Sequence, residues 1–394
     1  MTLEDRIASA LKNALDIHTT AESIETGTLT VYSICTAPTA DTTLFQPAIK
    51  DDHCMTRKDR LVFVGYSPHA AQESFQLMFA FCVSEYSTKT ALIVNMEKID
   101  TTGITPINIP VASTSIKAYI NHILLTTPVS TSIRIHVFAR SQSQYLFPGS
   151  KHIPSKRIRT DTQLVQWWMR VLADSASLGR CDNQTKLLWV VPGETSTSTT
   201  TTRILSSSNT LWTWGLGADS HNRLPLFPDD PVTKACGMVQ SSAGDIDPTA
   251  VMDILGVLGE CQSVCALLCL ESIPQNTSNQ TCDTSIKVNN ATQDELNALM
   301  KLWMTMDFSN VDACTRSSTK LIKYVQSTLG NVGLAHVDVT VAGKSDSKLN
   351  VSVASNSTNT VQSIQGLVKR HAPAEAITTP IKTLSANLIK RQKQ

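Results

Sequence analysis

The sequence predicts an α/β protein in which strands and helices are intermixed along the chain. Apolar segments of strand composition and amphipathic helical patterns occupy the first 270 of the 394 residues, without an internal repeat or an obvious linker. A chain of this length holds one large domain or two ordinary ones. We expect one domain over residues 1–342, with flexible loops near 195–209 and 274–291, and a mobile polar linker and basic tail over residues 343–394.

The helical segments are recognised by their apolar periodicity and by their start signals. Residues 114–125 carry apolar side chains at i, i+3, i+4, i+7 and i+8. Asp247 and Pro248 supply an N-cap and a first-turn proline, and Thr292 with Glu295 forms a capping box. The predicted helices cover residues 3–16, 114–125, 161–178, 248–259, a segment that begins at 292, and 310–329.

The strand segments are short and apolar. Ile133, Ile135 and Val137 alternate with polar residues, which is typical of a strand with one buried face. The predicted strands cover residues 28–35, 61–66, 76–84, 91–96, 133–137, 187–191 and 264–270.

Composition and missing motifs exclude several classes of function. The 34 Lys and Arg residues nearly balance the 33 Asp and Glu residues, which disfavours a nucleic-acid-binding protein. No apolar run approaches the ~18 residues of a membrane span, and the acidic N-terminus does not resemble a secretory signal, so we expect an intracellular protein. Glycine-rich nucleotide loops and hydrolase motifs are absent from the sequence. The ten cysteines lack metal-binding spacing, so no metal is expected.

The densest candidate site lies over residues 138–168. A strand ends near Arg140, and a basic run with Lys156, Arg157 and Arg159 precedes a helix that contains two tryptophans. Cations beside a helix start suit a phosphorylated ligand, and aromatic walls suit the rest of an amphipathic cofactor. A solvated basic loop beside ordinary core aromatics is the alternative interpretation.

Two further features carry carboxylates. Asp229 and Asp230 stand between prolines in the segment 224–231, where they suit recognition or deprotonation of a cationic group such as a lysine amine. Asp100 follows a buried strand in the sequence Asp-Thr-Thr-Gly. The alternatives are a helix-start turn for the acidic pair and an ordinary turn residue for Asp100.

Three motifs, taken in order, resemble those of one protein family. Ser-Gln-Tyr-Leu-Phe-Pro occupies residues 143–148, a tryptophan pair follows the basic run, and Pro-Leu-Phe-Pro-Asp-Asp-Pro occupies residues 225–231. Tyr145 and Trp167 are separated by 22 positions (167 − 145), as in the family. The chain thus resembles the fungal regulator-of-Ty-transposition histone H3 acetyltransferases, well over residues 89–231 and loosely beyond them.

The resemblance implies a fold like that of the CBP-type acetyltransferases, with a central mixed β-sheet flanked by helices and a long loop over the acetyl-CoA site. It implies acetyl transfer from acetyl-CoA to lysines of histone H3, first the lysine in the N-terminal helix of the H3 core and then tail lysines. The implied partners are histones H3–H4 and histone chaperones of the anti-silencing-function and nucleosome-assembly-protein types. The implied setting is the nucleus, in replication-coupled nucleosome assembly and the DNA-damage response, without membrane or direct nucleic-acid binding.

The family's functional residues carry over position by position. The implied catalytic residues are Asp100, Trp168 and Asp230. The implied coenzyme-binding residues are Phe138, Arg140, Gln142, Tyr145, Lys156, Arg157 and Trp167. The basic C-terminal tail resembles the segment through which the family engages chaperone and histone.

One position departs from the family pattern. The family has a self-acetylated lysine directly after Asp-Asp-Pro, where this chain has Val232, and Lys234 matches an arginine. A catalytically weakened member that acts as a chaperone-binding scaffold is therefore the alternative function. An unrelated acyl-CoA-dependent enzyme with a small-molecule acceptor is a further alternative.

Overall fold

The computed structural model describes one compact unit within Met1–Ser345. The described residues are 1–18, 24–46, 48, 54–69, 75–104, 106–107, 109–177, 183–206, 212–219, 223–239, 247–258, 264–274, 290–329 and 332–342. The predicted tail over 343–394 and nearly all of the predicted loop over 274–291 lie outside these residues.

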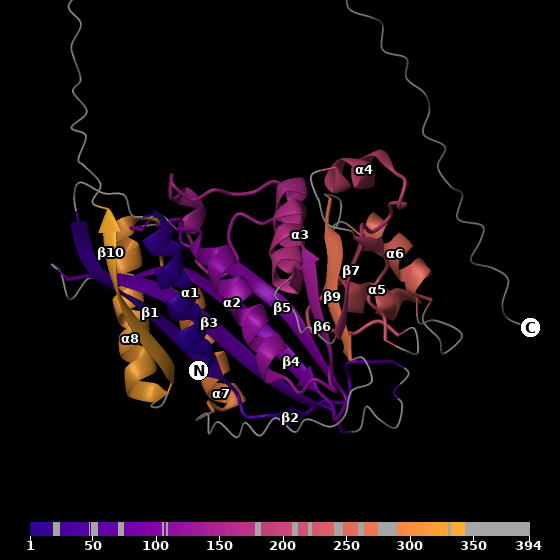
Figure 1. The fold of residues 1–394 in the computed structure, drawn as a ribbon, viewed down its shortest axis with the longest axis horizontal. Helices are drawn as coiled ribbons and strands as arrows, with labels where there is room; N and C mark the ends of the chain where they lie inside the picture. The colour runs from indigo at the N-terminus through magenta and orange to yellow at the C-terminus, as the bar shows by residue number, and fades with distance from the viewer. Residues whose placement is uncertain are drawn as a thin grey trace, which may run out of the picture. The chain divides into compact units, whose positions relative to one another are not determined.

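A mixed β-sheet forms the centre of the unit (Figure 1). Its strands are β1 (Ile24–Cys35), β2 (Thr39–Ala40), β3 (Thr56–Pro68), β4 (Gln76–Ser87), β5 (Ala91–Thr101), β6 (Ser132–Ala139), β7 (Asn183–Val190), β8 (Thr213–Trp214), β9 (Ala266–Pro274) and β10 (Gly333–Ala342). The strand order is β10-β1-β3-β4-β5-β6-β9-β7-β8, with β2 paired to β3. The pairs β5–β6 and β7–β8 are parallel and the other pairs are antiparallel.

Helices cover both faces of the sheet, which confirms the predicted fold class (Figure 1). On one face, α1 (Leu3–His18), α2 (Val111–Thr126) and α3 (Asp161–Ser177) share an apolar cluster with the strands. On the other face, α7 (Gln293–Met304) and α8 (Val311–Thr328) share a second cluster. No helix of the described residues has the length and apolar character to cross a membrane.

The connection β5–α2–β6 fixes where a ligand site forms. Because β5 and β6 are parallel, their carboxyl ends lie at the same edge of the sheet. The loop from β5 to α2 and the long loop from β6 to α3 both start at this edge. Ligands of α/β sheets bind in the crevice outside the carboxyl ends of strands, so these two loops are the natural walls of a site.

The predicted elements match most of the longer helices and strands, and several elements were missed. Thr292 and Glu295 make the predicted capping box of α7, and Asp247 caps α6 (Pro248–Val257). Part of the predicted loop at 195–209 is instead the short helix α4 (Thr199–Leu205), whose N-cap Ser198 accepts a hydrogen bond from the Thr201 N–H. Helix α5 (Pro231–Val239) and the edge strand β10 are also absent from the predicted elements.

A buried ion pair lies beneath α2. Arg60 Nε donates to Glu85 Oε1 at 2.9 Å, Tyr119 Oη donates to the same oxygen at 3.1 Å, and Arg60 also donates to Ser33 Oγ. Burial by itself raises the pKa of Glu85, but the charges of Arg60 and Lys58 and the hydrogen bonds from Arg60 and Tyr119 outweigh burial and hold this pKa below its usual range. The pair therefore stabilises the fold only while Glu85 is ionised.

We expect Glu85→Gln to lower the free energy of unfolding by about 3–5 kcal/mol at pH 7, because it leaves the Arg60 charge buried without its partner. A carboxyl with a depressed folded-state pKa stabilises the fold above its unfolded pKa of ~4.3 and loses this effect as pH falls through the folded value. Urea unfolding at pH 7 and pH 3 should therefore show a gap between wild type and variant that narrows in acid. A stability difference that stays the same at both pH values contradicts a stabilising role of ionised Glu85. A difference no larger than that caused by the exposed control Asp253→Asn contradicts it as well.

Candidate functional site

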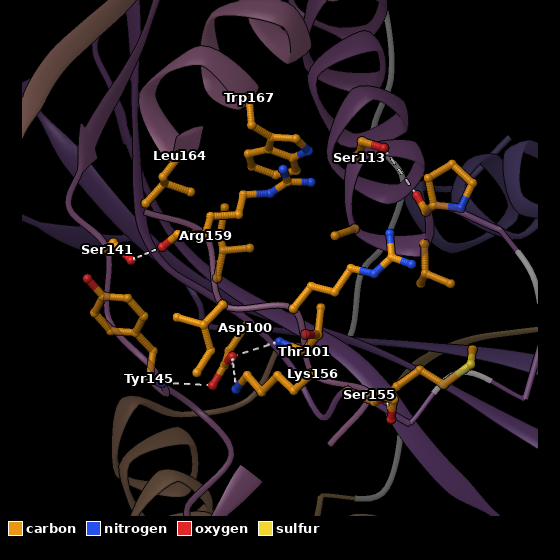
Figure 2. A pocket seen from close by; sticks show the side chains of 18 of the residues that line it. Asp100, Thr101, Ser113, Ser141, Tyr145, Ser155, Lys156, Arg159, Leu164 and Trp167 are labelled. Atoms are coloured by element: carbon orange, nitrogen blue, oxygen red, sulfur yellow. Dashed lines mark hydrogen bonds and ion pairs between the residues drawn. The ribbon is translucent and has the colours of Figure 1, made fainter. Parts of the chain in front are cut away.

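A cavity of about 870 Å³ lies at the carboxyl ends of β5 and β6 (Figure 2). One wall comes from the end of β5 and the start of α2, and the other comes from the loop between β6 and α3 and from α3 itself. The lining residues used below are Asp100, Ser113, Gln142, Tyr145, Lys156, Arg157, Ile158, Arg159 and Trp167. Apolar side chains of Met78, Ile99, Ile107, Ile109, Val111 and Leu164 complete the wall.

Asp100 joins the two walls of the cavity. Its Oδ2 accepts hydrogen bonds from the backbone N–H groups of Tyr145, Leu146 and Phe147 at 2.7, 2.9 and 3.2 Å. Its Oδ1 accepts from the Thr101 N–H and from Lys156 Nζ, at 2.8 and 2.7 Å (Figure 2). Both oxygens are thus fully engaged, so Asp100 acts as an anchor for the loop rather than as a free base.

Lys156 uses its charge inside the protein. Its Nζ donates to Asp100 Oδ1 and to Ser150 Oγ, each at 2.7 Å, and its side chain is only 5% exposed. Burial lowers the pKa of Lys156, and the Asp100 carboxylate opposes that effect. Lys156 therefore lines the predicted cofactor site, but its ammonium group already has two partners.

A glycine permits the close approach of the two walls. Gly103 has a φ of +83°, and a β-carbon there would lie 2.5 Å from the Lys156 Cβ. The Gly103 carbonyl accepts a hydrogen bond from Ser155 Oγ at 2.7 Å. Only glycine accepts this backbone conformation and this contact at once, which explains the Asp-Thr-Thr-Gly sequence in physical terms.

The β6–α3 loop is also fixed at its start. The Ser141 N–H donates to Asp161 Oδ1 at 3.0 Å, and Ser141 Oγ donates to the Arg159 carbonyl at 2.5 Å. Tyr145 Oη donates to the Arg140 carbonyl at 2.7 Å. The loop therefore presents its side chains to the cavity from a backbone held at several points.

The two tryptophans of α3 have different surroundings. Trp167 lines the cavity, and the Arg159 guanidinium lies over its ring at 5.7 Å from the centroid (Figure 2). Trp168 is 4% exposed and belongs to the core cluster, with its ring edge-on to Trp167 at 5.0 Å between centroids. Trp168 packs against Trp167 and is not among the residues that line the large cavity.

The amino end of α2 faces the cavity as well. Val111, Ala112 and Ser113 line it, no side chain caps this helix, and its first turn has no acidic residue. Free N–H groups and the helix dipole make such an end favourable for an anion. The predicted helix over 114–125 misses residues 111–113, because Val111 directly follows Pro110 and lies outside the apolar stripe that starts at Ile116.

The structure places a second group of predicted residues elsewhere. Phe138 and Asp230 line a separate small cavity of about 20 Å³, together with Asn95 and His136, while Arg140 is not among the lining residues of either cavity. A space of this size accommodates a single water molecule. Asp100 and Asp230 therefore do not share a cavity.

Asp230 caps a helix. Its Oδ1 accepts the Val232 N–H at 2.8 Å, directly before the first-turn Pro231 of α5. Burial raises the pKa of Asp230 to about 6, despite the opposing effects of that N–H and of Lys234. The preceding Asp229 has a φ of 58°, a strained conformation for a residue other than glycine.

The departure from the family pattern falls in this helix. Val232 is buried and packs in an apolar cluster with Leu224 and Cys236, whereas Lys234 is exposed on the same helix. The adjoining cavity of about 20 Å³ is far too small for an acetylated lysine side chain. Valine fills this place through apolar packing.

Comparisons with known proteins show which proteins this chain is similar to. Residues 122–236 match the family described as histone acetyltransferase KAT11-type domain. Histone acetyltransferase rtt109 of Aspergillus flavus is 31% identical over 167 residues, which are 39% of this chain and 28% of that protein. Histone acetyltransferase rtt109 of Schizosaccharomyces pombe is 27% identical over 193 residues, 45% of this chain and 51% of that protein. The matched segments thus span between about a quarter and about half of the length of these relatives.

A solved structure confirms the fold. The crystal structure of Rtt109 from Aspergillus fumigatus matches 87% of this chain and all of that chain, with a TM-score of 0.66 and 19% sequence identity. The predicted resemblance to this type of protein is therefore confirmed.

We expect Lys156→Met to lower the free energy of unfolding by about 3–5 kcal/mol, because it leaves the Asp100 charge buried without its cationic partner. The matched control is Lys151→Met, which changes an exposed lysine of the same loop. Urea unfolding of both variants at pH 7 tests the assignment. Equal stability of the two variants contradicts the anchoring role of the Lys156–Asp100 pair.

Proposed function

We propose that this chain, which matches a KAT11-type domain and has the Rtt109 fold, is a histone acetyltransferase that uses acetyl-CoA. The observation that carries the proposal is the amphipathic cavity at the end of β5 and β6. Its mouth holds Arg157 and Arg159, and its wall is apolar. Its volume of about 870 Å³ lies in the range of sites for extended small molecules.

The residues at the mouth and wall suit the parts of the coenzyme. Arg157 and the uncapped amino end of α2 offer donors to phosphate groups, since guanidinium and free helix N–H groups both bind such anions. Trp167, Tyr145 and the aliphatic wall suit the pantetheine arm. Gln142 lies on the loop that Asp100 holds. We assign Phe138, Arg140 and Lys156 supporting roles in shaping this loop.

The reaction needs a neutral lysine amine held against a thioester. Free lysine has a pKa near 10.4, so a proton must leave the amine before attack. Asp230, with a pKa raised to about 6, accepts a proton more readily than an ordinary aspartate and is the carboxylate we propose for this relay. Positioning in a site sheltered from water supplies the remaining acceleration.

The substrate and its setting are proposed from the family that the sequence motifs resemble. We infer lysines of histone H3 as acceptors, the N-terminal helix of its core first and its tail second, presented by chaperones of the anti-silencing-function or nucleosome-assembly-protein type. The names of the relatives, which are histone acetyltransferases, support a histone as the acceptor protein. A nuclear location and a part in nucleosome assembly and the DNA-damage response belong to the same proposal.

One observation favours a second candidate function. Buried Val232 stands where the family has its self-acetylated lysine, so this site lacks that modification. A member that binds coenzyme and chaperone without turnover is therefore the alternative.

We expect purified protein to transfer labelled acetyl groups to H3–H4, with stimulation by an anti-silencing-type chaperone. Arg157→Ala should raise the KM for acetyl-CoA about tenfold with little change in kcat, because it removes a charge-assisted contact to the coenzyme. Lys151→Ala, an exposed change in the same loop, is the control.

Other outcomes of this assay support one of the alternative functions or contradict the coenzyme assignment. Coenzyme binding without transfer supports the scaffold, and acetylation of free amines without dependence on histone supports a small-molecule acetyltransferase. An unchanged KM in Arg157→Ala contradicts the coenzyme assignment.

We expect kcat/KM to rise with pH through about 6 as Asp230 ionises, and Asp230→Asn to abolish this inflection while lowering the rate. Asparagine is an equally good N-cap, so the variant keeps the start of α5. Asp229→Asn is the matched control at the neighbouring exposed acid, where asparagine accepts the positive φ. If both variants show the wild-type pH profile, Asp230 has no part in the relay.

A further inference from the structure

Three arginines gather beside the coenzyme cavity. A second hollow of about 360 Å³ is lined by Arg157, Ile158, Arg159, Gln163, Gln166 and Arg170. Arg157, Ile158 and Arg159 line this hollow and the large cavity alike, so the two spaces are contiguous. Arg170 and the two glutamines belong to the hollow alone, and no motif of the sequence singles them out.

The three guanidinium groups are close enough to affect one another. No ion pair joins any of them to a carboxylate of the described residues. Burial, Arg170 and Arg157 lower the pKa of Arg159, in that order of effect. Converging like charges without a carboxylate cost free energy, and a bound anion relieves that cost.

Helix α3 carries three of the residues that line the hollow. Gln163, Gln166 and Arg170 follow at i, i+3 and i+7, so one face of the helix carries two amides and a guanidinium. Arg159 approaches from the preceding loop and lies over the Trp167 ring. Fork-shaped guanidinium groups with neutral amide donors suit a phosphate, which accepts several hydrogen bonds at once.

The phosphate charges of the coenzyme need cations close to the large cavity. Coenzyme A carries a pyrophosphate and a separate phosphate monoester on its nucleotide. The ammonium of Lys156 is already bonded to Asp100 and Ser150, so other cations must meet part of this charge. Arg159 and Arg170 are the cations that the contiguous hollow provides.

We propose that Arg159 and Arg170, together with Arg157, form a phosphate subsite for the nucleotide end of the coenzyme, and that this subsite distinguishes nucleotides with a terminal phosphate monoester from those without it. The proposal rests on the proposed function, because it assigns the coenzyme to the adjoining cavity. Ile158, which is 49% exposed, adds an apolar surface beside the phosphate donors.

Calorimetric titration with coenzyme A and with dephospho-coenzyme A tests the subsite. Wild type should bind coenzyme A about tenfold more tightly, since one additional charge-assisted phosphate contact is worth roughly that factor. Arg170→Ala and Arg159→Ala should bring this ratio close to one, mainly through weaker binding of coenzyme A. The preference should also shrink as salt rises from 50 to 300 mM, because the arginines are exposed.

The control is Arg316→Ala, which removes an exposed arginine of α8 outside both cavities. It should keep the wild-type ratio, and thermal melts of all variants verify folding. Arg170→Lys keeps the charge without the fork and should retain part of the preference.

The outcomes separate the two proposals. Equal binding of both nucleotides by wild type, or a wild-type ratio in both arginine variants, overturns the subsite while leaving acetyl transfer intact. Binding of neither nucleotide overturns the subsite and the proposed function together.

Discussion

The carboxylate of Asp100 holds the candidate site together. It is placed at the end of a central strand, and its two oxygens receive three loop N–H groups, one local N–H group and a buried ammonium. Hydrogen bonds to a charged acceptor are the stronger kind, and several of them converge here in a largely buried place. The position of the β6–α3 loop, and therefore of Tyr145 and its neighbours, depends on this group.

This arrangement divides the charged residues into two kinds. Asp100 and Lys156 neutralise each other and build the wall, whereas Arg157 and Arg159 remain exposed at the mouth. Asp230 has a structural role as the N-cap of α5. Burial also raises its pKa to about 6, which suits the proposed transfer of a proton. Asp100, which stands out in the sequence motif, thus affects activity through the position of the loop, without touching the substrate.

Apolar patterns and caps in the sequence were sufficient to predict the helix that begins after Thr292 and the stripe of α2. They were insufficient for α5 and the short α4, since proline-rich and threonine-rich segments carry weak local signals. The alternation of Ala335, Val337 and Val339 with polar residues in β10 is a strand pattern that the prediction overlooked. The order of strands in the sheet depends on long-range pairing, which periodicity does not encode.

The site was predictable in part for similar reasons. The sequence indicates which residues are cationic and aromatic, and six predicted residues line one cavity: Asp100, Gln142, Tyr145, Lys156, Arg157 and Trp167. The partners of Asp100 are backbone N–H groups, which every residue has, so its anchoring role was invisible. Trp168, which the sequence analysis assigns to the catalytic residues, packs in the core with Val165, Met169 and Leu172. Arg170 required the three-dimensional convergence of helix and loop.

Amide hydrogen exchange at Tyr145, Leu146 and Phe147 tests the central claim most directly, when measured in wild type, in Asp100→Asn and in the exposed control Asp174→Asn. We expect slow exchange of these amides in wild type and control, at least about tenfold faster exchange in Asp100→Asn, and loss of acetyl-CoA binding in that variant alone. Unchanged exchange at these three amides in Asp100→Asn, with acetyl-CoA bound as tightly as by the control, would contradict this claim.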